Sequence, residues 1–233
     1  MNIKEIPNTN LKVDIQKYPI DEILGEKIDE ALPSRSFFMG LIGAPASGKT
    51  TLSLSLLCCK SAYRKIFDTI IFVSPKLITV RELKKKYVPE VYHYEELSTD
   101  NMDEIDQLIT NSFEDGNPSL LLIDDMLVHL KEIMVERWLV NKIVNRRHEK
   151  LSIIITSQIY NKIPLAIRKL FTNVALFNTK SKKELEAMYD EFNCTCKEKY
   201  YELMRYIYKK PHDFAFFDLV NSTIYRNFNK LLY

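Results

Sequence analysis

Residues 43 to 50 read GAPASGKT, a complete G-x-x-x-x-G-K-S/T phosphate-binding motif. In such a loop, successive backbone N–H groups point at the α- and β-phosphates of a nucleotide, the lysine reaches the β- and γ-phosphates, and the hydroxyl ligates Mg²⁺. An apolar run at 37–42 precedes the motif and a leucine-rich stretch at 52–57 follows it, which is the required order of strand, loop and helix. The motif predicts an ATP site in a nucleoside triphosphatase.

The residues predicted to bind the nucleotide are Gly43, Ala44, Pro45, Ala46, Ser47, Gly48, Lys49, Thr50 and Thr51. Among them, Lys49 is also predicted to act in catalysis and Thr50 to ligate Mg²⁺.

A second apolar run, Leu120–Ile123, ends in the two carboxylates of Asp124 and Asp125. A buried strand of a parallel sheet brings such residues to the carboxyl edge of the sheet, where the phosphate loop also lies. There Asp124 is expected to hold Mg²⁺ together with Thr50, and Asp125 is expected to polarise the attacking water as a general base. The alternative is that the pair caps the next helix, because Asp is a favoured N-cap residue.

Three further side chains are candidates for catalysis. Gln158 follows a third apolar run, Ser152–Thr156, and is expected to sense the γ-phosphate or orient water; the alternative is an ordinary strand-end amide. Arg147 and Arg168 are candidates to reach a nucleotide bound by a neighbouring subunit, because a guanidinium is planar and permanently charged. The alternatives are a helix C-terminal cation for Arg146 and Arg147 and a simple surface residue for Arg168.

Apolar strand candidates alternate with helical stretches along the chain, which predicts an α/β fold with a mainly parallel central sheet flanked by helices on both faces. Residues 1–34 hold three prolines and are predicted to form an N-terminal arm, which leaves 35–233 as a single domain. The predicted strands are 37–42, 69–73, 91–94, 120–123, 152–156, 174–177 and 214–219. The predicted helices follow the phosphate loop and cover 101–111, 127–148, 181–192 and 197–209.

The helix predicted over 127–148 is the longest. Leu130, Met134 and Trp138 recur at i, i+4 and i+8, the spacing of a helix face that packs on a core. The predicted apolar stripe is widened by Ile133, Val140 and Val144.

The charge composition excludes a global basic field. The chain has 33 Lys and Arg against 31 Asp and Glu, a formal net charge of +2. Any nucleic-acid contact must therefore come from local clusters such as Lys84–Lys86, Lys180–Lys183 or Lys209–Lys210, for which the alternative is a solvated helix face.

The N-terminus lacks the apolar core of a signal peptide, and no apolar run approaches the roughly 18 residues of a membrane span. A soluble intracellular protein is expected.

The four cysteines match neither a disulfide framework nor a paired C-x-x-C zinc spacing. Cys58 and Cys59 are adjacent, and Cys194 and Cys196 flank one threonine. Reduced thiols are expected, and a zinc site built from Cys194, Cys196 and His212 stays open as an alternative.

Taken together, these motifs resemble the poxvirus-type genome-packaging ATPases of the FtsK/HerA superfamily, which occur in large DNA viruses, virophages and related transposons. The resemblance covers about residues 35 to 230. It rests on the phosphate loop, Leu121–Asp125, Arg147-His148 shortly before Ser152–Ile155, Ser157-Gln158, Ile163-Pro164 with Ile167-Arg168, and Tyr225–Phe228.

The resemblance implies a RecA-like core that binds ATP and Mg²⁺, assembles into a homo-oligomeric ring of five or six subunits, and pumps double-stranded DNA into a preformed capsid. It implies capsid or portal partners, a place at viral assembly sites in the host cytoplasm or with the virion, a sensor role for Gln158 and a trans role for Arg147 or Arg168. Two other functions stay open: a P-loop nucleotide or nucleoside kinase, and an assembly factor that binds nucleotide without using it.

Overall fold

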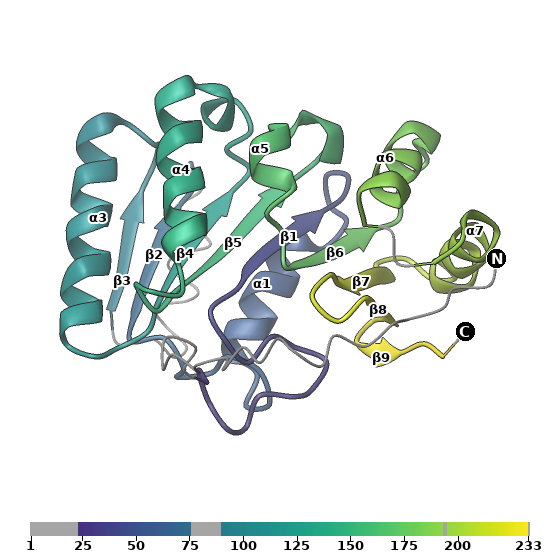
Figure 1. The fold of residues 1–233 in the computed structure, drawn as a ribbon, viewed down its shortest axis with the longest axis horizontal. Helices are drawn as coiled ribbons and strands as arrows, with labels where there is room; N and C mark the ends of the chain where they lie inside the picture. The colour runs from purple at the N-terminus through teal and green to yellow at the C-terminus, as the bar shows by residue number, and fades with distance from the viewer. Residues whose placement is uncertain (1–22, 76–89, 193–194, 233) are drawn as a thin grey trace, which may run out of the picture.

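The strand that leads into the phosphate loop, β1 (Phe38–Ile42), lies inside a nine-stranded sheet (Figure 1). The structure, a computed structural model, describes residues 23–75, 90–192 and 195–232. The strand order within them is β3-β2-β4-β5-β1-β6-β7-β8-β9. The other strands are β2 (Thr69–Val73), β3 (Glu90–Tyr94), β4 (Ser119–Asp124), β5 (Leu151–Ser157), β6 (Asn173–Phe177), β7 (Phe214–Asp218), β8 (Thr223–Arg226) and β9 (Asn229–Lys230). All seven predicted strands are confirmed, to within one residue at each end.

The sheet is mainly parallel, as predicted. Strands β1 to β6 pair in parallel, and β7, β8 and β9 continue the sheet from β6 as an antiparallel meander. Every residue of β1, β2, β4, β5 and β6 is buried, which is why these strands read as continuous apolar runs. Strands β8 and β9 were missed because, at four and two residues, they are too short to form such a run.

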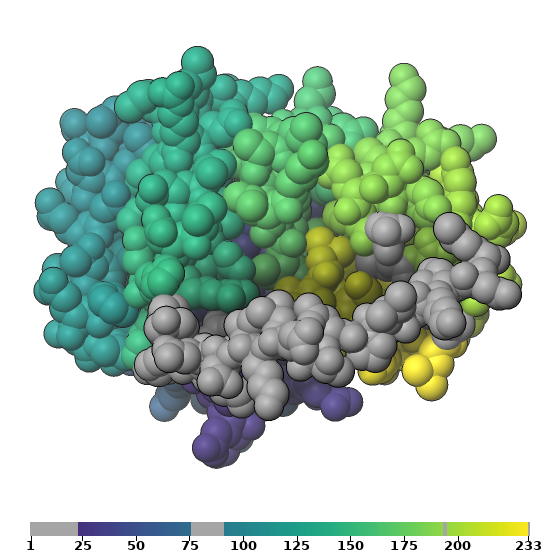
Figure 2. All heavy atoms as spheres, in the orientation of Figure 1, coloured from purple at the N-terminus to yellow at the C-terminus, as the bar shows by residue number. Residues whose placement is uncertain are grey.

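Helices cover both faces of the sheet, as predicted, but unequally (Figure 1). Helix α1 (Lys49–Cys58) packs on one face, in a core cluster that includes Phe37, Met39 and Leu41. The other face is covered by α3 (Thr99–Glu114), α4 (Ile133–Asn145), α5 (Leu165–Arg168), α6 (Lys182–Phe192) and α7 (Lys197–Ile207). Figure 2 shows the face that α3 and α4 cover. Alternate strand residues point to opposite faces, so Phe38 and Ile42 belong to this second cluster. None of the described helices has the length and apolar character of a membrane span.

The single helix predicted over 127–148 is wrong. A short 3-10 turn, η1 (His129–Lys131), comes first, and Glu132 is extended with ψ 127° before α4 begins. This extended residue resets the helical register, so α4 buries Val135, Leu139 and Ile143. Half of the predicted stripe therefore lies on the solvent side, since Ile133, Met134 and Val144 are 67%, 63% and 58% exposed. The other half is confirmed, since Leu130 is buried and Trp138 and Val140 are partly buried against the core.

Residues 23–34 pack against the turn that follows α1. The Asp29 N–H donates to the Ser61 carbonyl at 2.9 Å, and the buried Tyr63 hydroxyl donates to the Pro33 carbonyl at 3.0 Å. This part of the predicted arm is thus tied to the core by hydrogen bonds. The boundary between arm and domain stays a prediction.

The buried carboxylate of Asp213 joins the turn after α7 to the end of β8. It accepts hydrogen bonds from the N–H groups of Lys209 (3.1 Å) and Lys210 (2.8 Å), from the Arg226 guanidinium (2.9 Å) and from the Asn227 side-chain amide (2.6 Å). Burial raises the pKa of this carboxyl, but the hydrogen bonds from Asn227 and Arg226 outweigh burial and hold the pKa well below its usual range. The turn that leads into β7 is therefore fixed by an ionised carboxylate.

We predict that Asp213→Asn lowers the free energy of unfolding by about 1–3 kcal/mol at neutral pH, because buried donors lose their acceptor. The native pKa lies below the unfolded value of about 3.9. The stabilisation is therefore complete above about pH 4 and is lost as the pH falls from there through the native pKa. Urea denaturation at about pH 7 and about pH 2.5 should show the gap between variant and wild type narrowing in acid.

An equal gap at both pH values would contradict this account of Asp213. The matched control is Glu202→Gln on the exposed side of α7, which is expected to leave the free energy of unfolding unchanged.

Candidate active site

The loop between β1 and α1 has the backbone geometry that its glycines predict. Gly48 has a left-handed φ of 111°, a region that glycine enters without steric cost. Ala46 also has a left-handed φ, of 59°, at a cost that a glycine would not have. At Gly43, a Cβ atom would lie 2.6 Å from the Cβ of Phe177, so a side chain there would clash. The Gly43 N–H donates to the Ser157 carbonyl at 3.0 Å. The loop is therefore anchored to β5 and packed against β6.

The Lys49 side chain is held over its own loop. Its Nζ donates to the carbonyls of Gly43 (2.6 Å) and Ala44 (2.9 Å), and the residue is buried. Lys49 is also the first residue of α1, where the partial positive charge of the helix N-terminus adds to that of the ammonium. An anion bound in this loop would meet both charges.

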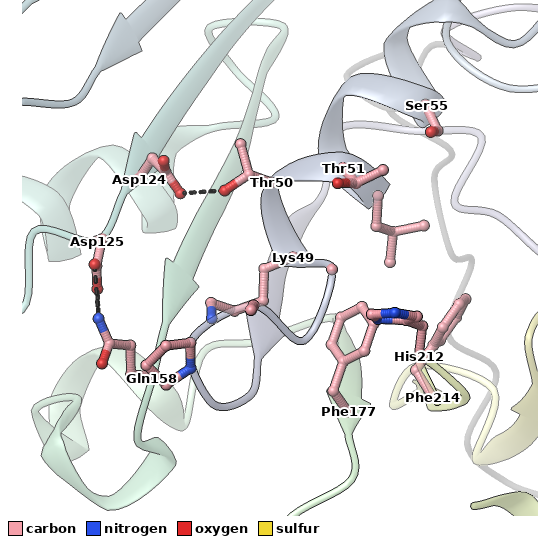
Figure 3. A pocket seen from close by; sticks show the side chains of 14 residues that line it. Lys49, Thr50, Thr51, Ser55, Asp124, Asp125, Gln158, Phe177, His212 and Phe214 are labelled. Carbon is pink, nitrogen blue, oxygen red and sulfur yellow. Dashed lines mark hydrogen bonds between the residues drawn. The ribbon is translucent and has the colours of Figure 1, made fainter. Parts of the chain in front are cut away.

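Asp124 lies at the end of β4 and faces the first turn of α1 (Figure 3). Its Oδ1 accepts hydrogen bonds from the hydroxyls of Thr50 (3.3 Å) and Thr156 (2.6 Å). Its Oδ2 is buried and accepts no hydrogen bond from any residue in the described ranges. A buried carboxylate oxygen without a donor is costly, and a hard cation is the partner that suits it. The Thr50 and Asp124 oxygens therefore fit Mg²⁺.

Asp125 and Gln158 contact each other directly. The Gln158 Nε2 donates to both carboxylate oxygens of Asp125, at 3.0 and 2.7 Å (Figure 3). Asp125 also has a left-handed φ of 60°, and its N–H donates to the Thr156 hydroxyl at 3.1 Å. A non-glycine residue in this conformation costs on the order of 1–3 kcal/mol. The fold thus holds the Asp125 carboxylate at the end of β4 at a cost, with Gln158 as its partner.

These contacts bear on two alternatives that the sequence left open. The residues that precede the next helical elements are Val128 and Glu132, so the acid pair does not cap a helix. The side-chain amide of Gln158 donates to both carboxylate oxygens of Asp125, and its role at the γ-phosphate stays a prediction. Its strand β5 lies between β1 and β4, which brings Gln158 between the phosphate loop and the acids.

The loop and the acids open into one cavity of about 620 Å³. Figure 3 shows Asp124, Asp125 and Gln158 on one side of Lys49 and Thr50, and Phe177, His212 and Phe214 on the other. The predicted residues that line the cavity are Pro45, Ala46, Gly48, Lys49, Thr50, Thr51, Asp124, Asp125 and Gln158. Sequence reasoning missed Leu52, Ser55, Phe177, His212 and Phe214. The two phenylalanines read as ordinary strand residues, and no sequence signal marks them as site residues.

Arg147 lies far from this cavity within its own subunit. It follows α4 and precedes β5, so it is at the amino edge of the sheet, and the length of β5, roughly 20 Å, separates it from the phosphate loop. Its neighbour Arg146 donates from Nη1 to the Ile143 carbonyl at 2.8 Å, which confirms for Arg146 the alternative of a helix C-terminal cation. A trans role for Arg147 stays a prediction.

Arg168 is held in an ion pair with Glu191 of α6. Its Nε donates to both carboxylate oxygens at 3.0 and 3.1 Å, and its Nη2 lies 2.8 Å from Oε1. The guanidinium also lies over the ring of Tyr160, whose hydroxyl donates to Glu191 at 2.6 Å. Arg168 is therefore not a simple surface residue. Its trans role also stays a prediction, and it requires this ion pair to open.

The zinc alternative finds no support in the described ranges, where no group of three His, Cys, Asp or Glu side chains could hold a metal ion. Cys194 lies outside those ranges, Cys196 is exposed, and His212 contacts the phosphate loop. The lysine cluster at 84–86 also lies outside the described residues.

The chain is similar to known proteins in sequence and in fold. The family model described as Poxvirus A32 protein matches residues 27–215. No curated protein sequence matches the chain.

Solved structures are similar in fold. B204, the DNA-packaging ATPase of Sulfolobus turreted icosahedral virus, aligns with a TM-score of 0.64 at 18% identity over 84% of this chain and 98% of that one. The genome packaging NTPase B204 of Sulfolobus turreted icosahedral virus 2, in complex with ATP-gammaS, gives 0.59 at 20% identity over 82% and 96%. ATPases 2 and 3 of EssC from Geobacillus thermodenitrificans give 0.51 at 13% identity over 76% and 40%. The chain therefore has the α/β fold of P-loop NTPases.

We predict that Thr156→Val weakens Mg²⁺ binding about 10- to 100-fold, the usual effect of removing a group that orients a metal ligand. The Thr156 hydroxyl donates to Asp124 and accepts from the Asp125 N–H, so valine removes both bonds. Calorimetric titration of Mg²⁺ in the presence of a non-hydrolysable ATP analogue measures the affinity. Thr156→Ser keeps the hydroxyl and is expected to bind Mg²⁺ like the wild type. Equal affinities for the Val and Ser variants would contradict the role given to Thr156.

Proposed function

The chain belongs to the Poxvirus A32 protein family, and from this membership and the geometry of its site we propose that it is an ATP-hydrolysing double-stranded DNA translocase that packages a viral genome into a capsid. The proposal is supported by the similarity in fold to B204, which is a DNA-packaging ATPase. The observation that favours hydrolysis is the convergence of the phosphate loop, the Asp124 carboxylate and the Asp125–Gln158 pair on one cavity.

In the proposed reaction, water attacks the γ-phosphorus and the bond to the β,γ-bridging oxygen breaks. Asp125 takes the proton of the water as general base, and Gln158 fixes the direction of that carboxylate. Lys49 and the loop N–H groups stabilise the negative charge that develops on the phosphates. Thr50 and Asp124 would hold Mg²⁺, which supplies further neutralisation of that charge when bound.

The Asp125–Gln158 pair also argues against the assembly factor that binds nucleotide without hydrolysing it. A carboxylate held beside the phosphate loop by a partner amide can activate water, and a protein that only binds nucleotide does not require such a group. No contact in the described residues specifically favours the kinase alternative, which an assay for phosphate transfer to a nucleoside or nucleotide acceptor tests.

Translocation would require a ring of subunits around DNA, with five or six copies by family analogy and a capsid or portal protein as partner. DNA contact would come from local lysines, such as those at 180–183 or 209–210, because the net charge is only +2. We place such a ring at viral assembly sites in the host cytoplasm.

We predict that Lys49→Ala lowers ATP turnover at least about 100-fold, because the phosphates lose their only positively charged contact within the loop motif. Wild-type turnover is expected to rise when double-stranded DNA is added. Release of inorganic phosphate, measured with and without DNA, tests both statements. Lys60→Ala, at an exposed position just after α1, is the control and should behave like the wild type. If DNA leaves the ATP turnover of an assembled wild-type ring unchanged, the proposal that the protein is a DNA translocase is contradicted.

A subunit-mixing experiment tests the two arginines. Subunits with Arg147→Ala or Arg168→Ala are mixed with wild-type subunits, and ATP turnover is measured. We predict that the variant that lacks the trans arginine inhibits mixed rings out of proportion to its fraction, because each altered subunit disables its neighbour. Glu191→Gln breaks the Arg168 ion pair but keeps the arginine. If Arg168 acts in trans, only Arg168→Ala inhibits disproportionately. If both Arg168→Ala and Glu191→Gln lower turnover in simple proportion, Arg168 acts only within its own subunit.

A further inference from the structure

One end of the cavity is aromatic and has no role in the reaction described above. It is formed by Phe177 at the end of β6, His212 in the turn before β7, and Phe214 at the start of β7 (Figure 3). The rings of Phe177 and Phe214 have centroids 5.4 Å apart. Both phenylalanines are largely buried, whereas His212 is exposed. Figure 3 shows the exposed imidazole beside the two buried rings, and an accessible flat ring is a surface on which a base can stack.

The residues at the opposite end of the cavity indicate where the aromatic end lies relative to the phosphates of a bound nucleotide. Asp124, Asp125 and Gln158 serve the γ-phosphate and its metal, and the loop with Lys49 serves the β-phosphate. The α-phosphate and the nucleoside must therefore extend away from the acids, past Thr51. In that direction the cavity is lined by Leu52, Ser55 and the three aromatic residues.

The exposed ring is held firmly in place. The His212 Nδ1–H donates to the Ser47 carbonyl of the phosphate loop at 2.9 Å, and the residue has a left-handed φ of 66°. The next residue, Asp213, carries the four hydrogen bonds that fix this turn. The ring of His212 also lies close to Gly48, where an added Cβ would be 3.6 Å from Nδ1. The protein's own contacts thus hold the platform against the phosphate loop, and a fixed surface lowers the entropy cost of binding.

We propose that His212, supported by Phe214 and Phe177, is the stacking platform for the nucleobase of the bound triphosphate. This assignment rests on the proposed function, because it takes the phosphates to lie in the loop. Selectivity between bases comes from hydrogen-bonding groups placed at the base edges. At this end of the cavity, the described lining residues with polar side chains are Thr51, Ser55 and His212, and His212 already uses Nδ1 on Ser47. The hydroxyls of Thr51 and Ser55 can both donate and accept, so they can pair with the edge of either purine, and we expect adenine and guanine to bind with similar affinity.

Calorimetric titrations with ATP, GTP and inorganic tripolyphosphate, each with Mg²⁺, test the platform. For the wild type, ATP and GTP are expected to bind within about fivefold of each other and tighter than tripolyphosphate. His212→Ala is expected to weaken ATP binding about tenfold, equal to about 1.4 kcal/mol, and to leave tripolyphosphate binding unchanged. His212→Phe keeps a ring and is expected to restore most of the ATP affinity. His129→Ala, a change at a histidine paired with Glu132 outside the cavity, is the control.

The outcomes separate the platform from the function on which it rests. If tripolyphosphate and ATP bind the wild type equally, or if His212→Ala leaves ATP affinity within twofold, the platform is wrong and the phosphate site stands. If His212→Ala weakens tripolyphosphate as much as ATP, His212 only supports the loop, and the platform is again wrong. If neither ligand binds the wild type, the proposed function fails, and the platform fails with it.

Discussion

The contact between Asp124 and Thr50 is the constraint on which the rest of the site depends. It joins the end of β4 to the first turn of α1, across a separation of 74 residues in the chain. The hydroxyl of Thr156 on β5 donates to the same carboxylate oxygen, so three elements meet at one atom. This meeting requires the strand order in which β5 lies between β1 and β4. In any other strand order, the carboxylates at the end of β4 and the amide of Gln158 would not both lie beside the phosphate loop.

Several residues of the site adopt a conformation or environment that costs free energy. Asp125 adopts a left-handed backbone, Gly43 accepts a contact with Phe177 that no side chain would allow, and the second oxygen of Asp124 is buried without a donor among the described residues. Such costs are tolerated where the surrounding packing is strong. Here that packing comes from strands whose residues are buried on both faces, so rearrangement of the loop would disturb the core beneath it.

The C-terminal part of the chain completes the cavity from the other side. Strands β7 and β8 continue the sheet from β6, and the buried carboxylate of Asp213 ties the turn before β7 to β8. As a result, His212 reaches the phosphate loop from a position 165 residues away in sequence. The phosphate loop therefore lies between two groups of side chains. The polar group, with Asp124, Asp125 and Gln158, suits hydrolysis, and the aromatic group, with His212, suits binding of the nucleobase.

The sequence by itself determined the parallel sheet, its strands, the phosphate loop and the residues at the strand ends. These features are local: a buried strand needs a continuous apolar run, and the loop needs glycine at defined positions. Tertiary structure alone decided the register of α4, which the extended Glu132 resets. It also decided the pairing of Gln158 with Asp125, the ion pair of Arg168 with Glu191, and the aromatic end of the cavity. Each of these depends on which side chains from distant segments come within contact distance, and periodicity and motif spacing describe only neighbours along the chain.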